Sequence, residues 1–160
     1  MSEKTRSVLA LFGFLLAAYA VGALGARLAA PDIAAWYPHL HKPPLTPPGA
    51  LFAPAWTVLY TLMGIAAWLA WLTRISSCRA SGLRMWAVQL LINFAWIGVF
   101  FRMHSPAVAL IDLLLLILAI VLTMRPFFTI RPLAAWLLAP YLAWTLFALY
   151  LNIGIAVLNR

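Results

Sequence analysis

Five apolar runs, each long enough to cross a lipid bilayer as a helix, dominate this sequence of 160 residues. They cover approximately residues 8–30, 51–73, 83–101, 107–124 and 133–158. A hydrocarbon core of roughly 30 Å needs about 20 residues of α-helix. The runs lack the period-two alternation of membrane β-strands, so they predict helices. The sequence therefore predicts an all-α integral membrane protein, with residues 1–160 forming a single domain of five transmembrane helices.

The composition argues against a water-soluble domain. Apolar residues make up 66% of the chain and charged residues only 9%, whereas soluble domains are about half apolar and about a quarter charged. The net charge is +8, but the basic residues stand singly between apolar runs. That arrangement favours helix ends facing anionic lipid headgroups over a nucleic-acid partner.

The basic residues also predict an orientation. The first run follows Lys4 and Arg6, as in a secretory signal, but it exceeds the usual apolar core of about 7–15 residues. We interpret it as the first transmembrane helix, with a cleaved signal as the alternative. If the chain crosses the membrane five times, the basic residues on the same side as the N-terminus are Lys4, Arg6, Arg74, Arg79, Arg84, Arg125 and Arg131. Those on the other side are Arg27, Lys42, Arg102 and Arg160. The excess predicts a cytoplasmic N-terminus.

The connection between the first two runs, residues 31–50, differs from the other loops in its proline content. It holds Pro31, Pro38, Pro43, Pro44, Pro47 and Pro48. Proline removes a backbone N–H and restricts the residue before it, so we expect a stiff, extended path without a regular helix. A loop of this length in so small a protein is a candidate lid.

Polar residues inside the apolar runs are candidates for function, because a bilayer tolerates few of them. Gln89 and Asn93 are four residues apart and share one helix face, and Asn152 lies in the fifth run. Hydrogen bonds between helices are the alternative explanation for all three residues.

Asp112 is the only acidic residue within a predicted span. Its carboxylate is expected to pair with Arg102 or Arg27, or to cap a neighbouring helix. A role in proton relay is the alternative, although no second titratable partner lies near Asp112 in the sequence.

The eight tryptophans are numerous for this length. Trp56 begins a stripe with Tyr60 and Gly64 at steps of four, and Trp144 precedes Ala148 at the same step. Small residues beside large rings leave room for a flat ligand, and an indole N–H can hydrogen-bond it. Core packing is the alternative explanation of both stripes.

The sequence contains no catalytic constellation and no spacing typical of a resident metal site. His39 and His41 in the long loop are weak candidates for a metal or a haem iron. Ala18, Gly22 and Ala26 form a stripe of small residues, which permits close helix contact within the bundle or across a dimer.

Several motifs in order along the chain resemble the tryptophan-rich sensory protein/translocator protein family. The first two blocks are Trp36-Tyr37-x-x-Leu40-x-Lys42-Pro43-x-x-x-Pro47-Pro48 and Pro54-x-Trp56-x-x-Leu59-Tyr60-x-x-Met63-Gly64. The later blocks are Gln89-Leu90-x-x-Asn93-x-Ala95-Trp96, Ala109-Leu110-x-Asp112-Leu113-Leu114-Leu115 and Pro140-Tyr141-Leu142-Ala143-Trp144-x-x-Phe147-Ala148-x-x-x-Leu151-Asn152. The resemblance covers nearly the whole chain.

The resemblance implies a five-helix bundle, usually a homodimer, with a ligand pocket under the first loop. The implied ligands are tetrapyrroles such as protoporphyrin IX and haem, together with other hydrophobic small molecules. By motif position, Trp56 and Trp144 are expected to hydrogen-bond the ligand. The other expected pocket residues are Trp36, Tyr37, Asn93 and Ala148.

The function that the resemblance implies is a membrane receptor or carrier for tetrapyrroles, in their transport or in the regulation of their metabolism. No cofactor of its own is expected. One alternative is light-dependent oxidative breakdown of protoporphyrin IX by Trp56 and Trp144. A second alternative is a structural or regulatory membrane partner. A location in a bacterial cell envelope is expected.

Overall fold

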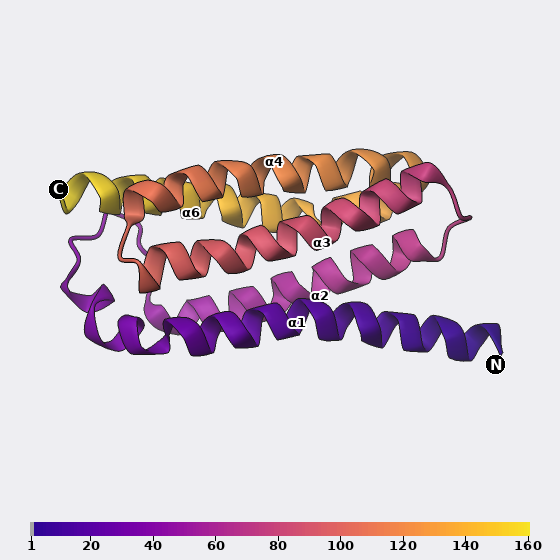
Figure 1. Ribbon diagram of the computed structural model, residues 1–160, viewed down its shortest axis with the longest axis horizontal. Coiled ribbons are helices and arrows are strands. Elements are labelled where there is room, and N and C mark those ends of the chain that lie inside the picture. The colour runs from indigo at the N-terminus through magenta and orange to yellow at the C-terminus, as the bar shows by residue number, and fades with distance from the viewer. Residues whose placement is uncertain (1) are drawn as a thin grey trace.

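The fold is a bundle of long helices that lie side by side along one axis (Figure 1). The computed structural model describes residues 2–160, and this part of the chain contains no strand. The helices are α1 (Glu3–Ala35), α2 (Phe52–Trp71), α3 (Ser77–Ile97), α4 (Pro106–Ile130), α5 (Pro132–Trp136) and α6 (Ala139–Leu158). Short helical turns are η1 (Tyr37–His39), η2 (Gly49–Leu51) and η3 (Gly98–Arg102). The prediction of an all-α fold is confirmed.

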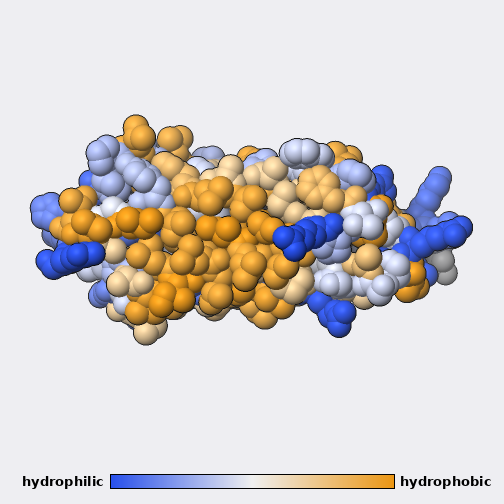
Figure 2. Space-filling model, turned by 90° about the horizontal axis from the view of Figure 1, so that it is seen from above, coloured by the Kyte–Doolittle hydropathy of each residue, from blue (hydrophilic) through white to orange (hydrophobic). Residues whose placement is uncertain are grey.

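The helices form five spans that are long and apolar enough to cross a membrane. α1 and α4 each form a span alone, whereas η2 joins α2, η3 joins α3 and α5 joins α6. Large apolar side chains such as Leu16 and Leu91 are 72% and 67% exposed, as expected where lipid is the solvent. Figure 2 shows apolar residues over the middle of the molecule and hydrophilic residues towards its ends. The chain is an integral, multi-pass membrane protein.

Proline positions explain where the helices depart from the apolar runs. We predicted that the loop begins at Pro31, but α1 continues through Pro31 to Ala35. Pro126 likewise lies inside α4, which extends to Ile130 rather than ending near residue 124. Membrane helices tolerate such prolines where neighbouring helices hold the segment. Pro140 instead lies in the first turn of α6, and the fifth span is divided between α5 and α6.

Close packing beyond Pro126 accounts for the extra length of α4. Phe127 is fully buried, and it lies against Gly82 at the start of α3. A Cβ atom on Gly82 would come within 2.7 Å of the Phe127 ring, so only glycine allows this approach. The contact holds the last turn of α4 against α3 and outweighs the hydrogen bond that proline removes.

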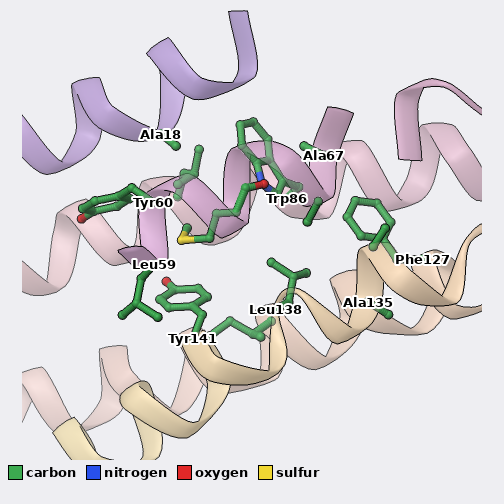
Figure 3. Packing of buried hydrophobic residues seen from close by; sticks show 14 of the residues in the cluster. Ala18, Leu59, Tyr60, Ala67, Trp86, Phe127, Ala135, Leu138 and Tyr141 are labelled. Carbon is green, nitrogen blue, oxygen red and sulfur yellow. The ribbon is translucent and has the colours of Figure 1, made fainter. Parts of the chain in front are cut away.

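The core combines large side chains with buried alanines (Figure 3). Trp86 of α3 is 5% exposed, and its indole N–H donates to the Met63 carbonyl of α2 over 3.0 Å. Its ring meets Phe14 of α1 edge to face, with centroids 5.4 Å apart. Buried alanines such as Ala67 and Ala70 let the helices approach closely. Trp86 therefore ties three helices together.

The stripe of small residues in α1 packs inside the bundle. Ala18 is fully buried in the core, and Gly22 contacts the Tyr60 ring of α2. Gly25 contacts Ile97 at the end of α3 in the same way. Ala26, by contrast, is exposed. Of the two alternatives for this stripe, contact within the bundle or across a dimer, Ala18 and Gly22 serve contact within the bundle.

An ionic clasp links the end of α1 to the turn between α3 and α4. Asp32 is 8% exposed. Its two carboxylate oxygens lie 2.8 Å from an Arg102 guanidinium nitrogen and 2.8 Å from His104 Nε2. The expected pairing of Asp112 with Arg102 is wrong, because Arg102 bonds Asp32 instead. The buried Oδ2 of Asp112 has no hydrogen-bond partner among residues 2–160. Asp112 is also not the only acidic residue in a membrane helix, since α1 includes Asp32.

Removal of the clasp should destabilise the bundle. Asp32→Asn is expected to lower the free energy of unfolding by about 1–2 kcal/mol, because charged hydrogen bonds are lost but Arg102 is half exposed to solvent screening. Unfolding in detergent micelles would measure the change. Combination with Arg102→Gln should add less than the two single effects, and strictly additive losses would contradict the pairing.

Candidate ligand-binding cavity

A cavity of about 610 Å³ lies inside the half of the bundle that contains the connection between α1 and α2. This connecting segment comprises residues 36–51. The cavity walls come from the second half of α1, the first half of α2, the end of α3 with η3, and α6 from Trp144 to Ile155. Its volume is in the range of about 300–1,000 Å³ that is typical of small-molecule sites.

Aromatic side chains form much of the cavity wall. They are Tyr19, Tyr37, Phe52, Trp56, Tyr60, Trp96, Phe100, Phe101 and Trp144. No charged side chain is among the described residues that line it. Such a lining favours a flat, apolar and largely uncharged ligand body, because aromatic faces stack and an unpaired charge would be costly.

A wide helical turn places two consecutive phenylalanines on the cavity wall. In η3, the N–H of Met103 donates to the carbonyl of Gly98 over 3.1 Å, five residues back, as in a π-helix. The extra residue in this turn changes the direction of the side chains, so that Phe100 and Phe101 both face the cavity. Their rings are edge to face with centroids 4.9 Å apart.

The two tryptophans expected to bind the ligand both line this cavity. Trp56 of α2 stacks on Tyr60 with ring centroids 5.3 Å apart. Trp144 of α6 meets Phe52 edge to face at 6.0 Å. No hydrogen bond among residues 2–160 uses either indole nitrogen. Both N–H groups are therefore available as donors to a ligand.

Ala148 and Tyr37 also lie where the sequence expectation put them, on the cavity wall. Ala148 follows Trp144 by one helical turn, and its small side chain leaves the space beside that ring open. Tyr37 begins η1, and the Lys42 ammonium lies 4.7 Å from its ring centroid. Burial raises the pKa of the Tyr37 phenol.

Two other expected pocket residues do not line the cavity. Asn93 is fully buried behind Tyr60, and its side-chain oxygen accepts a hydrogen bond from the Tyr60 hydroxyl at 3.0 Å. Trp36 stacks on His104 at 4.3 Å, outside the cavity. Asn93 therefore positions a wall residue, whereas Trp36 packs against the ionic clasp.

Several wall residues were absent from the expected set. Tyr60 belongs to the Trp56 stripe, for which both a flat ligand and core packing stayed open. Asn152 was a candidate for function with interhelical hydrogen bonding as the alternative, and Trp96 stands in a family motif, but none of the three was assigned to the pocket. Their sequence positions could have indicated the wall. Tyr60 lies one turn after Trp56, Trp96 lies near Asn93, and Asn152 lies one turn after Ala148. Tyr19 carries no comparable pattern. Its hydroxyl bonds the Thr61 hydroxyl of α2 at 2.6 Å, and this contact became visible only in the fold.

Hydrogen bonds hold the connecting segment against Tyr150 of α6 and against Asn159, the residue after α6. The backbone N–H of His41 donates to Asn159 Oδ1, and Asn159 Nδ2 donates to the His41 carbonyl, both over 2.9 Å. The Tyr150 hydroxyl donates to the Pro44 carbonyl over 2.9 Å. These bonds use main-chain groups, so they fix the path of the segment.

The two histidines that the sequence offered as weak candidates for a metal lie apart from the cavity wall. No group of three His, Cys, Asp or Glu side chains that could hold an ion occurs within residues 2–160. His39 and His41 lie in the connecting segment and do not line the cavity. An apolar ligand is the chemistry that this site fits best.

Comparison with known proteins agrees with the architecture and the aromatic cavity. The model of the TspO/MBR family matches residues 14–158. The chain belongs to the TspO/MBR family. The match covers every helix that lines the cavity, so the site lies within the family domain.

Relatives of this TspO/MBR chain come from distant organisms. A tryptophan-rich protein TspO of Archaeoglobus fulgidus is 38% identical over 96% of this chain and 99% of its own length. The protein of the same description from Chlorobaculum tepidum is 42% identical over 88% of this chain and 89% of its own. The human translocator protein is 37% identical over 88% of this chain and 84% of its own.

Proposed function

We propose that this chain is a membrane receptor or carrier for tetrapyrroles, such as protoporphyrin IX and haem, which bind inside the helix bundle. The cavity between α1, α2, α3 and α6 is the observation that carries the proposal, because its aromatic lining suits a flat macrocycle. Trp56 and Trp144 supply free indole donors at its wall. The family membership supports the same conclusion.

The charged ends of a porphyrin need a different environment from its ring. Because no charged side chain lines the cavity, the two propionates are proposed to remain at the end of the cavity nearest the connecting segment. Lys42 stands there beside Tyr37, with its ammonium bonded to the Leu40 carbonyl at 3.2 Å. That ammonium can give up its hydrogen bond to the carbonyl and pair with a propionate carboxylate instead.

Titration of the purified protein with protoporphyrin IX tests the proposal. Tryptophan fluorescence in detergent micelles should show saturable quenching with a Kd of about micromolar or tighter, which is roughly −8 kcal/mol. Trp56→Phe and Trp144→Phe should each weaken binding about tenfold, since each removes one hydrogen bond but keeps a ring.

The matched control is Trp136→Phe, because Trp136 is 63% exposed on the outer surface and should leave the Kd unchanged. Absence of saturable binding by the unaltered protein would overturn the tetrapyrrole assignment. If the Trp56, Trp144 and Trp136 substitutions weaken binding equally, the cavity is not the porphyrin-binding site.

The same tryptophans favour one alternative function. Trp56, Trp96 and Trp144 line one cavity, so a porphyrin that is bound there and excited by light would lie beside several oxidisable rings. If the protein promotes oxidative breakdown, illumination with oxygen should consume bound protoporphyrin IX faster than free protoporphyrin IX. Persistence of the bound porphyrin under light would leave binding as the function.

The proposal includes assembly and orientation. A homodimer is expected within the bilayer, where exposed apolar faces such as that of Leu91 meet lipid or a second copy. The two chain ends lie at opposite ends of the bundle (Figure 1). We place the N-terminal end, with the larger share of basic residues, on the cytoplasmic side of a bacterial envelope membrane.

A further inference from the structure

Two arginines from different helices converge on one tryptophan at the end of the bundle that carries the N-terminus. The guanidinium carbon of Arg6 in α1 lies 5.9 Å from the centre of the Trp71 ring, and that of Arg79 in α3 lies 5.8 Å from it. Trp71 is the last residue of α2, so three helices meet in this cluster. The cluster lies at the opposite end of the bundle from the connecting segment and outside the cavity (Figure 1).

The positive charge of this cluster has no carboxylate beside it. Within residues 2–160, the only ion pairs are the two that Asp32 makes near the other end of α1. Arg79 is held in place, because its Nη1 donates to the Thr73 carbonyl over 2.8 Å and its backbone N–H donates to the Ser76 hydroxyl over 3.1 Å. Most N–H groups of the two guanidiniums, and all those of Arg6, make no hydrogen bond within the described chain and remain free as donors.

The arrangement suits a phosphate group. Two guanidiniums held near one ring repel each other, and an anion that contacts both removes this repulsion. A phosphate has several acceptor oxygens, so it can accept hydrogen bonds from both arginines at once, and the planar guanidinium fork matches its geometry. The contact with Trp71 keeps both forks near one point.

The position of the cluster favours the phosphate of a lipid over a phosphate in solution. Trp71 ends a helix long and apolar enough to span the membrane, and tryptophans at such ends lie at the level of the lipid headgroups. Leu9 and Leu16 follow Arg6 on nearly the same face of α1 and are 56% and 72% exposed. An acyl chain can lie along these leucines while its phosphate meets the arginines. A free phosphate makes only the charged contacts.

We propose that Arg6, Arg79 and Trp71 form a binding site for the phosphate of an anionic phospholipid. A lipid with a cationic headgroup, such as phosphatidylcholine, fits less well, because its ammonium group adds positive charge beside two guanidiniums. The bound phosphate joins the first turns of α1 to the start of α3. The site does not depend on the proposed tetrapyrrole function, because it shares no residue with the cavity.

Native mass spectrometry of the full-length protein measures lipid binding directly. The protein in detergent micelles is titrated with phosphatidylglycerol and, separately, with phosphatidylcholine that carries the same acyl chains. The first phosphatidylglycerol should bind about tenfold more tightly than the first phosphatidylcholine, because two basic residues attract its net charge. A large excess of inorganic phosphate should not displace it. Equal affinities of the two lipids, or displacement by inorganic phosphate, would overturn the proposal.

Charge-matched variants locate the site. Arg6→Gln/Arg79→Gln should bring the ratio of the two lipid affinities close to one. The control is Arg84→Gln/Arg125→Gln, which removes two charges at the same end of the bundle from exposed positions without a contact to the Trp71 ring. The control should keep most of the ratio. If both double variants lose the ratio equally, the preference comes from diffuse surface charge and the proposal is wrong.

Two single variants separate lipid binding from an effect on the fold. Arg79 also holds the end of α2 through the Thr73 carbonyl, whereas Arg6→Gln breaks no side-chain hydrogen bond within residues 2–160. Arg6→Gln should still lower the ratio about threefold. Arg79→Lys keeps the charge without the planar fork and should retain part of the ratio. An unchanged ratio in Arg6→Gln would refute a site shared by the two arginines.

Discussion

Ala148→Trp is expected to abolish saturable binding of protoporphyrin IX, with a loss of at least about 100-fold, while the bundle stays folded. Ala148 lines the cavity one turn after Trp144, and its methyl group leaves space beside that indole. A second indole at this position would occupy the space that we assign to the macrocycle. The side chain enters an existing cavity rather than a packed core, so the strain of overpacking should be small.

The control for this substitution is Ala143→Trp. Ala143 lies in the same helix but is exposed on the outer surface of the bundle, where a larger ring meets lipid. Fluorescence titration should show an unchanged Kd for this variant, and thermal unfolding should confirm that both variants fold. Normal porphyrin binding by Ala148→Trp would show that the ligand does not occupy the cavity.

Trp86→Ala should cause the largest loss of stability among single substitutions in the core, about 3–5 kcal/mol. The substitution removes the hydrogen bond to the Met63 carbonyl and the edge-to-face contact with Phe14. It also leaves unfilled the volume of a side chain that is 5% exposed. The Met63 carbonyl already bonds within α2, but the space left between three helices cannot close without moving them.

Trp136→Ala is the matched control, because Trp136 is 63% exposed and contacts mainly Phe128. Its loss of stability should stay below about 1 kcal/mol. Unfolding of both variants by a denaturing detergent, followed by circular dichroism, would measure the difference. Equal losses would mean that the buried contacts of Trp86 contribute little to the bundle.

The sequence predicted the membrane class and the number of spans, because five apolar runs of sufficient length leave no other fold. Helix ends were less predictable. Pro31 and Pro126 read as helix-ending residues, yet α1 and α4 continue past them. The compensating contacts come from residues distant in sequence, such as Gly82 against Phe127 and Asp32 against Arg102. Local rules about proline could not include them.

The candidate site divides in a similar way. Helical spacing put Trp56 in one stripe and Trp144 and Ala148 in another, with a flat ligand and core packing both left open, and the family resemblance proposed them for the pocket; all three line the cavity. Spacing alone did not reveal which face turns towards a cavity. Asn93 shares the polar stripe of α3, but its side chain contacts Tyr60 behind the wall.

The amino-acid sequence by itself determined that this chain is a five-span helical membrane protein with tryptophans on potential binding faces. Apolar length and helical period are local properties, and a bilayer makes them decisive. Only the tertiary structure decided that Asp32 pairs with Arg102 and that Arg6 and Arg79 meet at Trp71. Those relations join residues on different helices, and they depend on how the helices rotate and pack against one another, which no single segment specifies.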